Sequence, residues 1–204
     1  AFFDSKAKTI FIARDRFGVK PLYYSQTEQG FAFSSEIKGL LHLVGSEREM
    51  DLESVNRYIS FLWCPGEGTP LKNIRKLLPG EALTVKFGQI ERRWTWYKLP
   101  IFRNIAADLS EKDAINGTAF HLKQAVERQL VSDVPVGAFL SGGLDSSAVV
   151  AMAKIETPNI SCFTIDVVGG VDDGMTDDLP YARRAAKFLD VDLNVISINS
   201  KKIA

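Results

Sequence analysis

The sequence predicts two domains of different fold class: an α+β domain over residues 1–100 and an α/β domain with a parallel sheet over residues 111–204, joined by a linker at 101–110. Short β-branched and aromatic runs in the first half are separated by turn-forming residues, which is typical of antiparallel sheets. In the second half, strand-like runs alternate with amphipathic helices in the order β-α-β-α-β, which favours a parallel sheet. The stretch between the halves shows no sustained hydrophobic period.

The first elements of the chain are strands and a helix. We expect antiparallel strands at three places: residues 9–14, 21–24 and 31–34. Apolar side chains then recur at intervals of three and four over residues 34–44, which predicts a helix lying against that sheet. Arg14, Asp15 and Arg16 could form a structural ion-pair turn, to which Glu36 would tie the helix.

A second helix and a hairpin complete the predicted first domain. Asp51 is a good N-cap for the helix. Its apolar stripe is expected to face the core: Leu52, Val55, Ile59 and Leu62. The alternating runs at 82–87 and 90–97 predict a hairpin that turns at Gly88-Gln89.

The second domain begins with a capped helix. Ser110 to Asp113 match a capping box, and the helix is expected to run to about residue 131. The apolar run from Val134 to Leu140 suits a buried parallel strand, and residues 160–168 repeat that signal. Asp178 caps a further helix with Pro180 in its first turn, and the strand-like run 193–198 follows.

Composition and charge narrow the functional classes. The 204 residues are 46% hydrophobic and carry 25 Lys and Arg against 25 Asp and Glu, so we expect a folded protein with no net charge. Without a positive field, neither nucleic acid nor an anionic membrane surface is an expected partner. Cys64 and Cys162 lie far apart without a CxxC pair, which argues against a disulfide framework and a zinc site.

Signals for export or membrane insertion are not found in the sequence. No apolar run approaches the roughly 18 residues that a membrane span needs, and the first ten residues lack the basic start and apolar stretch of a signal peptide. We therefore expect a cytoplasmic protein. Because the sequence has no initiator Met and starts within a strand-like pattern, we also expect it to be a piece of a longer protein.

The most informative stretch is VGAFLSGGLDSSAVVAMA at residues 136–153, where a predicted strand feeds a glycine turn that opens into a helix. Gly142 and Gly143 can adopt positive φ and carry no Cβ, so backbone N–H groups can converge on an anion. The first turn of the helix adds unpaired N–H donors and the positive end of its dipole. Hydroxyls of Ser141 and Ser146 can donate to phosphate oxygens. These features predict a phosphate-binding loop.

The loop differs from a Walker P-loop, because the GxxxxGK[ST] spacing is missing. Asp145 would place a carboxylate beside bound phosphates, which is repulsive unless a divalent cation bridges the two. We therefore predict Mg²⁺ together with the nucleotide. The structural alternative is an ordinary strand-to-helix turn in which Ser141 and Asp145 act only as caps.

The SGGLDSS string resembles the pyrophosphate loop of the ATP-pyrophosphatase superfamily, whose members adenylate a carboxylate or carbonyl oxygen and release pyrophosphate. The flanking segments narrow this resemblance to the glutamine-hydrolysing asparagine synthetases. The similarity covers about residues 1–190 and rests on four segments: RDRFGVKPLYY at 14–24, SSEIKGLL at 34–41, LLPGE at 77–81 and SDVPVGAFLSGGLDSSAVVAM at 132–152.

The resemblance implies the later part of an Ntn-type glutaminase sandwich, followed by the start of an ATP-pyrophosphatase domain. In this family, ammonia released from glutamine passes through a tunnel and attacks an aspartyl adenylate made from ATP and aspartate. A homodimer is also implied. The resemblance assigns the ATP phosphates and magnesium-pyrophosphate to Ser141, Gly142, Gly143, Asp145 and Ser146, with Asp145 contributing to catalysis through the metal, and the adenosine part to Leu140 and Ile165.

The sequence also departs from the family pattern. A glutaminase of this kind uses a cysteine as the first residue of the mature chain, whereas this sequence has Ala1, and we interpret Cys64 and Cys162 as small apolar residues. LDVDLNVI at 189–196 lacks the histidine of the family's LG-x-x-H-x-E ending. Two alternatives therefore stay open: the same chemistry on another carboxylate such as a sugar acid, and a catalytically silent nucleotide-binding module.

Overall fold

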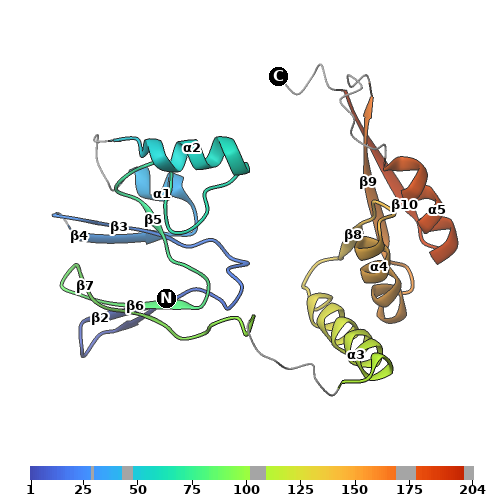
Figure 1. Cartoon of the computed structure of the whole chain (residues 1–204), viewed down its shortest axis with the longest axis horizontal. Coiled ribbons are helices and arrows are strands. Elements are labelled where there is room, and N and C mark those ends of the chain that lie inside the picture. The colour runs from blue at the N-terminus through green and yellow to red at the C-terminus, as the bar shows by residue number, and fades with distance from the viewer. Residues whose placement is uncertain (29, 43–47, 102–108, 169–177, 200–204) are drawn as a thin grey trace. The chain divides into compact units, whose positions relative to one another are not determined.

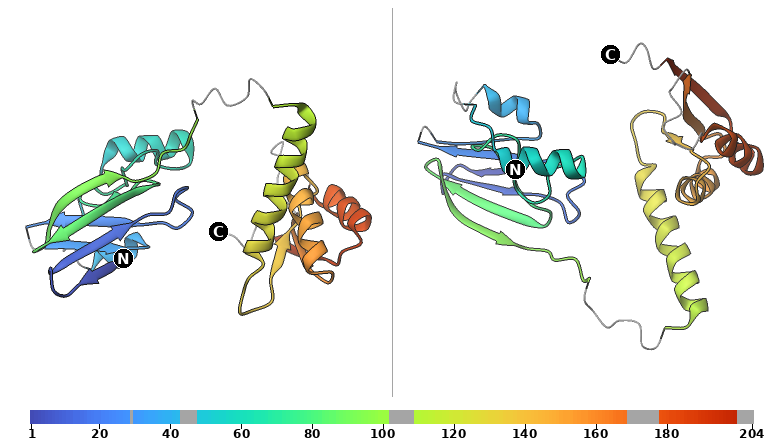
Figure 2. Two further views of the ribbon diagram at one scale, coloured as in Figure 1. Left: turned by 90° about the horizontal axis from the view of Figure 1, so that it is seen from below. Right: turned by 45° about the horizontal axis from the view of Figure 1, so that its top comes forward.

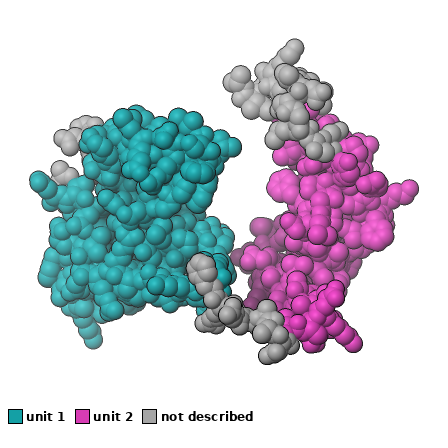
Figure 3. All heavy atoms as spheres, in the orientation of Figure 1, with its two compact units in different colours: residues 1–103 teal, residues 104–204 magenta. Residues whose placement is uncertain are grey.

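The computed structural model divides into two compact units, residues 1–103 and residues 104–204 (Figure 3). Among the described residues, no helix combines the length and the apolar composition needed to cross a membrane. Most of the predicted linker and the end of the helix expected up to residue 44 fall outside the described part of the chain. The structure describes residues 1–28, 30–42, 48–101, 109–168 and 178–199.

Unit 1 contains two antiparallel sheets. The first has the strand order β1-β2-β6-β7, with bounds Phe2–Asp4, Thr9–Ala13, Glu81–Lys86 and Gln89–Thr95. The second has the order β4-β3-β5, with bounds Gly30–Ser34, Tyr23–Thr27 and Arg75–Lys76. The three strands expected in the first 34 residues are confirmed, with ends that shift by up to three residues, and β1 was not foreseen.

The core of unit 1 lies between the two sheets. Alternate side chains of the facing strands meet there, as the period of two in a strand requires. Helices α1 (Ile37–Leu41) and α2 (Leu52–Phe61) lie over the other face of the three-stranded sheet (Figures 1 and 2). The buried members of this core are Ile12, Tyr24, Leu77, Leu83 and Val85.

Helix α2 confirms its predicted start and contradicts its predicted burial. The Asp51 carboxylate accepts hydrogen bonds from the backbone N–H groups of Glu53 and Ser54, as an N-cap should. The prediction that its apolar stripe faces the core was wrong, because Leu52 is 73% and Leu62 is 81% exposed. Apolar spacing identifies an apolar face of a helix, but it does not say whether another element covers that face.

The loop after β2 also differs from its prediction. Arg14 forms no ion pair with Asp15; its guanidinium donates to the backbone carbonyls of Gly18, Lys20 and Leu77, at 2.8, 3.0 and 2.7 Å. The Asp15 carboxylate instead accepts from backbone N–H groups of the same loop. The predicted ion-pair turn was therefore wrong in its chemistry, because carbonyls and N–H groups of the loop satisfy both side chains.

The hairpin of β6 and β7 is confirmed, but its turn lies one residue earlier than predicted. Lys86 pairs with Gln89, so the turn residues are Phe87 and Gly88. Both have positive φ, 49° and 76°. A two-residue turn of this kind matches the twist of the flanking strands, which explains why it forms despite the strain at Phe87.

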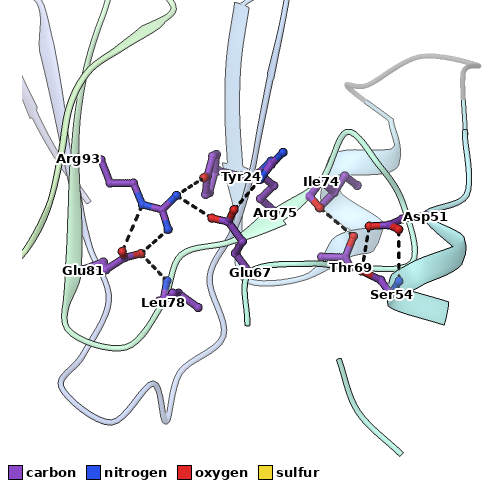
Figure 4. A network of polar contacts seen from close by, with 10 residues as sticks. All are labelled: Tyr24, Asp51, Ser54, Glu67, Thr69, Ile74, Arg75, Leu78, Glu81 and Arg93. Atoms are coloured by element: carbon purple, nitrogen blue, oxygen red, sulfur yellow. Dashed lines mark hydrogen bonds and ion pairs between the residues drawn. The ribbon is translucent and has the colours of Figure 1, made fainter. Parts of the chain in front are cut away.

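A polar network joins the two sheets of unit 1 (Figure 4). The Arg93 guanidinium on β7 donates to Glu81 on β6 at 2.8 Å and to Glu67 at 2.7 Å, and it reaches the Tyr24 hydroxyl on β3 at 3.3 Å. Arg75 on β5 pairs with the same Glu67 carboxylate at 2.6 Å. Hydrogen bonds from Arg93 and its positive charge, opposed by partial burial, hold the pKa of the Glu67 carboxyl below its usual value.

Unit 2 contains a parallel sheet, as the sequence predicts. Its strand order is β10-β9-β8, with bounds Leu193–Asn199, Ser161–Val168 and Gly137–Phe139. Both pairings are parallel. Three helices complete the unit: α3 (Glu111–Gln129), α4 (Leu144–Glu156) and α5 (Leu179–Leu189).

The three helices of unit 2 share one core with one face of the sheet. Val126 of α3, Val150 of α4 and Ala186 of α5 are buried together with Leu140 and Cys162. The opposite face is open in the described residues, with Phe139 71% exposed. The run from Val134 to Leu140 therefore does not form the buried strand that was predicted: only three of its residues pair, and Val134 and Phe139 are exposed.

The N-cap residues of α3 and α5 are those that the sequence predicts. The Ser110 hydroxyl accepts from the Asp113 N–H at 3.2 Å, which confirms the start of α3. Asp178 occupies the N-cap position of α5 and Pro180 its first turn, but the Asp178 side chain makes no capping hydrogen bond. Small residues on α5 let this helix approach the sheet closely, since Ala182 and Ala186 are buried.

Candidate functional site

The predicted phosphate loop lies between β8 and α4, at the carboxyl edge of the parallel sheet. Leu140 is 1% exposed and its N–H donates to the Phe163 carbonyl at 2.8 Å, so the last residue before the turn is fixed to the neighbouring strand. Gly143 is the N-cap of α4. The structure therefore brings Ser141, Gly142 and the first turn of α4 into one continuous loop at the edge where ligands of α/β sheets bind.

Gly142 has a conformation that other residues adopt with strain. Its φ is +82°, in the left-handed region. A Cβ at this position would lie 2.3 to 2.6 Å from backbone atoms of Tyr181 and Ala182, in the first turns of α5. The glycine is therefore needed for two reasons: the turn itself, and the close approach of α5 to the loop. Sequence analysis anticipated only the first, because residues 142 and 181 are distant in the chain.

The serine hydroxyls fix the shape of the loop. The Ser141 and Ser146 Oγ atoms lie 3.0 Å apart, the Ser141 N–H donates to Ser146 Oγ at 3.3 Å, and Ser146 Oγ lies 3.2 Å from the Gly143 carbonyl. The Gly143 N–H reaches Ser141 Oγ at 3.4 Å. These contacts close the turn on itself and hold the two hydroxyls against each other.

The first turn of α4 leaves backbone donors available. The first N–H groups of a helix have no intrahelical acceptor. In α4 the intrahelical bonds begin with the Ser147 N–H, which donates to the carbonyl of the N-cap, Gly143, at 3.1 Å. Within the described residues, the Gly142 N–H also has no recorded acceptor. These donors and the positive end of the α4 dipole favour an anion at this position.

Asp145 projects from the first turn of α4 and is exposed. In the part of the chain that the structure describes, its carboxylate has no ion pair or hydrogen bond, and no group of three or more His, Cys, Asp or Glu side chains could hold a metal ion. A single carboxylate fits a magnesium ion whose other ligands are phosphate oxygens and water. A single carboxylate does not fit a metal ion that protein side chains alone would hold in the absence of a nucleotide.

The two residues assigned to the adenosine part have different surroundings. The Leu140 side chain belongs to the buried core, so only its backbone borders the loop. Ile165 lies on β9, two residues beyond the pairing of Phe139 with Phe163, and is 47% exposed. Ile165 is therefore not at the end of its strand, as the sequence suggested, but in the interior of β9, which continues to Val168 and pairs with β10 on its other side.

The two cysteines have different surroundings. Cys162 is buried on β9, and burial raises the pKa of its thiol. Cys64 is half-buried, and its Sγ donates to the Ser54 carbonyl at 3.4 Å. The burial of Cys162 agrees with its interpretation as a packing residue, whereas Cys64 is only half-buried.

One contact that joins α4 to α5, at the ends of the helices away from the loop, was missed from the sequence. The Lys154 ammonium at the end of α4 donates to the carbonyls of Leu189 and Asp190, both at 2.7 Å. It thereby caps the last turn of α5, and holds the two helices that border the loop together. No sequence pattern links a lysine in one helix to the end of another.

Comparison with known proteins assigns each unit to a family. Residues 1–97 match the glutamine amidotransferase domain model, and residues 118–204 match the asparagine synthase model. Putative asparagine synthetase [glutamine-hydrolyzing] 2 of Methanocaldococcus jannaschii is 35% identical over 184 residues, which are 89% of this chain and 35% of the relative. Asparagine synthetase [glutamine-hydrolyzing] 1 of Bacillus subtilis is 34% identical over 154 residues, 75% of this chain and 24% of the relative.

A third relative has a different name. Amidase chyE of Penicillium rubens is 28% identical over 216 residues, which cover 98% of this chain and 31% of that protein. The chain spans between about a quarter and a third of the length of these relatives. The two matched models and the two asparagine synthetases agree, and the chain therefore belongs to the glutamine-hydrolysing asparagine synthetase family.

Proposed function

We propose that the loop from Leu140 to Ser146 binds the phosphates of ATP with Mg²⁺, as part of an enzyme that adenylates a carboxylate and then amidates it with ammonia from glutamine. Aspartate is the proposed acceptor. For unit 1 we propose the Ntn-type glutaminase sandwich, and for unit 2 the ATP-pyrophosphatase fold. The glutaminase and synthetase activities, and a homodimeric assembly, are proposed for the whole protein.

One observation carries the proposal: a parallel strand opens through a glycine with φ of +82° into a helix whose first N–H groups have no intrahelical acceptor. At many helix starts, a Ser, Thr, Asp or Asn side chain at the N-cap accepts from these donors. Here the N-cap is Gly143, which has no side chain to do so. A phosphate group supplies the missing acceptors.

The residues of the loop would act on charge and position. When the acceptor carboxylate attacks the α-phosphorus of ATP, the bond to pyrophosphate breaks and negative charge accumulates on the departing group. N–H groups at Gly142 and in the first turn of α4 would face that charge and would stabilise it without reorganisation. Hydroxyls of Ser141 and Ser146 would add donors. Bound Mg²⁺, held in part by Asp145, would supply further charge neutralisation.

The adenosine part of ATP would lie beyond the loop, along the carboxyl edge of the sheet. The Leu140 backbone lies at that edge, and the exposed Ile165 side chain lies on β9 two residues beyond its last pair with β8. An apolar side chain at this position can pack against a purine ring. The assignment of Ile165 is tested by Ile165→Asp, which should weaken ATP binding and leave inorganic pyrophosphate binding unchanged.

The identity of the acceptor is decided by ATP–pyrophosphate exchange with the full protein, Mg²⁺ and separate acids: aspartate and several sugar acids. Exchange that depends on aspartate would support asparagine synthesis. Exchange that depends on a sugar acid would support the same chemistry on another acceptor. ATP binding with no exchange for any acid would favour the nucleotide-binding module, and absence of ATP binding would overturn the loop assignment.

Asp145→Asn tests the role of the loop carboxylate in the same assay. We expect exchange to fall at least 100-fold while glutamine hydrolysis persists, because the two activities are assigned to different units. Asp192→Asn is the matched control, since Asp192 is an exposed aspartate that precedes β10 at the opposite, amino edge of the sheet. Equal loss of exchange in both variants would contradict the assignment.

A further inference from the structure

Unit 1 contains a cavity that the proposed activity of unit 2 does not use. Its volume is about 660 Å³, within the range of small-molecule sites. It is half open, and it is lined by the loop after β2, the end of α2, the segment between α2 and β5, and the residues that follow β5. Its walls are mainly aromatic and aliphatic: Phe17, Tyr23, Tyr58, Leu62 and Trp63.

Two cations line this cavity, Arg14 and Lys76, and Arg14 is the more fully engaged with the protein itself. The Arg14 guanidinium is used by three backbone carbonyls. The Lys76 ammonium donates to the Cys64 carbonyl and lies 5.7 Å from the centre of the Trp63 ring. An ammonium group has three N–H donors. Lys76 therefore retains donors for a further acceptor.

No carboxylate neutralises Lys76 within the described residues, where the ion pairs of unit 1 involve other side chains. Partial burial lowers the pKa of the Lys76 ammonium from its usual value. An unpaired cation on a mainly apolar wall is costly for the protein alone. An anion that enters the cavity would form the missing ion pair.

The neighbouring aromatic rings restrict what accompanies that anion. The Trp63 ring lies beside the ammonium, and Tyr58 and Phe17 line the same cavity. Such walls favour a flat or aliphatic body over a second charged group. The site thus combines one cationic contact with an apolar surface.

We propose that this cavity binds a small monocarboxylate with an apolar or aromatic body, whose carboxylate pairs with Lys76 and whose body packs against Trp63. The residues that line this cavity all belong to unit 1, and none of them belongs to the ATP loop. Its chemistry is a single charge-assisted hydrogen bond inside a mainly apolar enclosure.

Phenylacetate is the probe, and titration calorimetry with the full chain measures its binding. Phenylacetamide is the neutral analogue, and benzylamine has the same ring with a positive charge. We expect phenylacetate to bind at least tenfold more tightly than either. Quenching of tryptophan emission by phenylacetate, lost in Trp63→Phe, would place it beside Trp63, because the other tryptophans, Trp94 and Trp96, do not line this cavity.

Lys76→Met retains the length of the side chain and removes its charge. We expect it to weaken phenylacetate at least tenfold, with phenylacetamide unchanged. Lys72→Met is the matched control, because Lys72 pairs with Glu49 and does not line this cavity. Equal binding of phenylacetate and phenylacetamide, full affinity in Lys76→Met, or no binding to the unaltered chain would each overturn the proposal. ATP binding, measured in parallel, tests the proposed function separately.

Discussion

Two loops of this protein follow a strand and depend on a glycine of positive φ, but they satisfy their polar groups differently. In unit 1, Gly18 has φ of 66° and a Cβ there would lie 2.8 Å from Pro79. In unit 2, Gly142 has φ of 82° and a Cβ would overlap the backbone of α5. Both turns are therefore fixed by packing against a distant segment.

The difference lies in the source of the anion. In unit 1, the Asp15 carboxylate accepts from the N–H groups of Phe17, Val19 and Lys20, at 3.1, 3.0 and 3.0 Å. The loop thus contains its own anion. The loop at Gly142 has converging donors and no side-chain acceptor for the N–H groups of α4. The first loop therefore satisfies its own N–H groups, whereas those of the second loop remain open to water or to the phosphate that we propose.

The largest effect is expected from Gly142→Val. The positive φ costs a β-branched residue about 1–3 kcal/mol, and overlap with the backbone of α5 adds a cost of similar size. We expect unit 2 to lose most of its stability, and ATP binding with it. Thermal unfolding followed by circular dichroism and ATP titration measure the two effects. A stable variant with full ATP affinity would contradict both the packing role and the ligand role of this glycine.

Arg14→Met tests the loop after β2, which contains its own anion. Three carbonyls lose a charged donor, so we expect the free energy of unfolding of unit 1 to fall by about 2–4 kcal/mol. Urea unfolding followed by tryptophan emission isolates this effect, because Trp63, Trp94 and Trp96 all lie in unit 1. Arg16→Met is the control: its guanidinium lies over the Tyr97 ring at 5.3 Å, and we expect a loss of about 1 kcal/mol or less.

Gly143→Ala separates ligand binding from folding at the second loop. Gly143 has φ of −70° and ψ of 164°, and a Cβ there would meet only Ser141 Oγ, at 3.4 Å. Stability should therefore change by about 1 kcal/mol or less. The added methyl group would obstruct phosphates that approach the backbone, so ATP affinity should fall about tenfold in an equilibrium titration. Unchanged affinity would mean that phosphates do not approach the loop at this residue.

The comparison also explains what could be predicted from the sequence. Ser141 to Ser146 are neighbours in the chain, so their assembly into one loop followed from local spacing, and Asp51 and Ser110 were recognised as caps for the same reason. The contact of Gly142 with Tyr181 joins distant segments and leaves no local pattern. The predicted burial of the α2 stripe and of the strand that became β8 was wrong for a related reason. Burial depends on which element covers a residue, and apolar spacing does not contain that information.

The smallest effect concerns pH. Hydrogen bonds from the Lys20 and Val19 N–H groups lower the pKa of the Asp15 carboxyl, and the Arg93 hydrogen bond lowers that of Glu67. A carboxyl with a lowered pKa in the folded state stabilises the protein above its unfolded pKa, near 4. That contribution is lost as the pH falls through the folded value. Unit 1 should therefore become easier to unfold with urea below about pH 4.

Asp15→Asn should flatten this dependence, because an amide accepts hydrogen bonds but does not titrate. The measurement is the urea midpoint of the tryptophan transition between about pH 2.5 and 6, for the unaltered protein and the variant. Asp4→Asn is the control, since the Asp4 carboxylate also accepts from two backbone N–H groups, those of Lys6 and Ala7, but in an exposed turn. If Asp15→Asn keeps the full pH dependence, the Asp15 carboxylate does not stabilise the loop after β2. The contrast with the loop at Gly142 in unit 2 then fails.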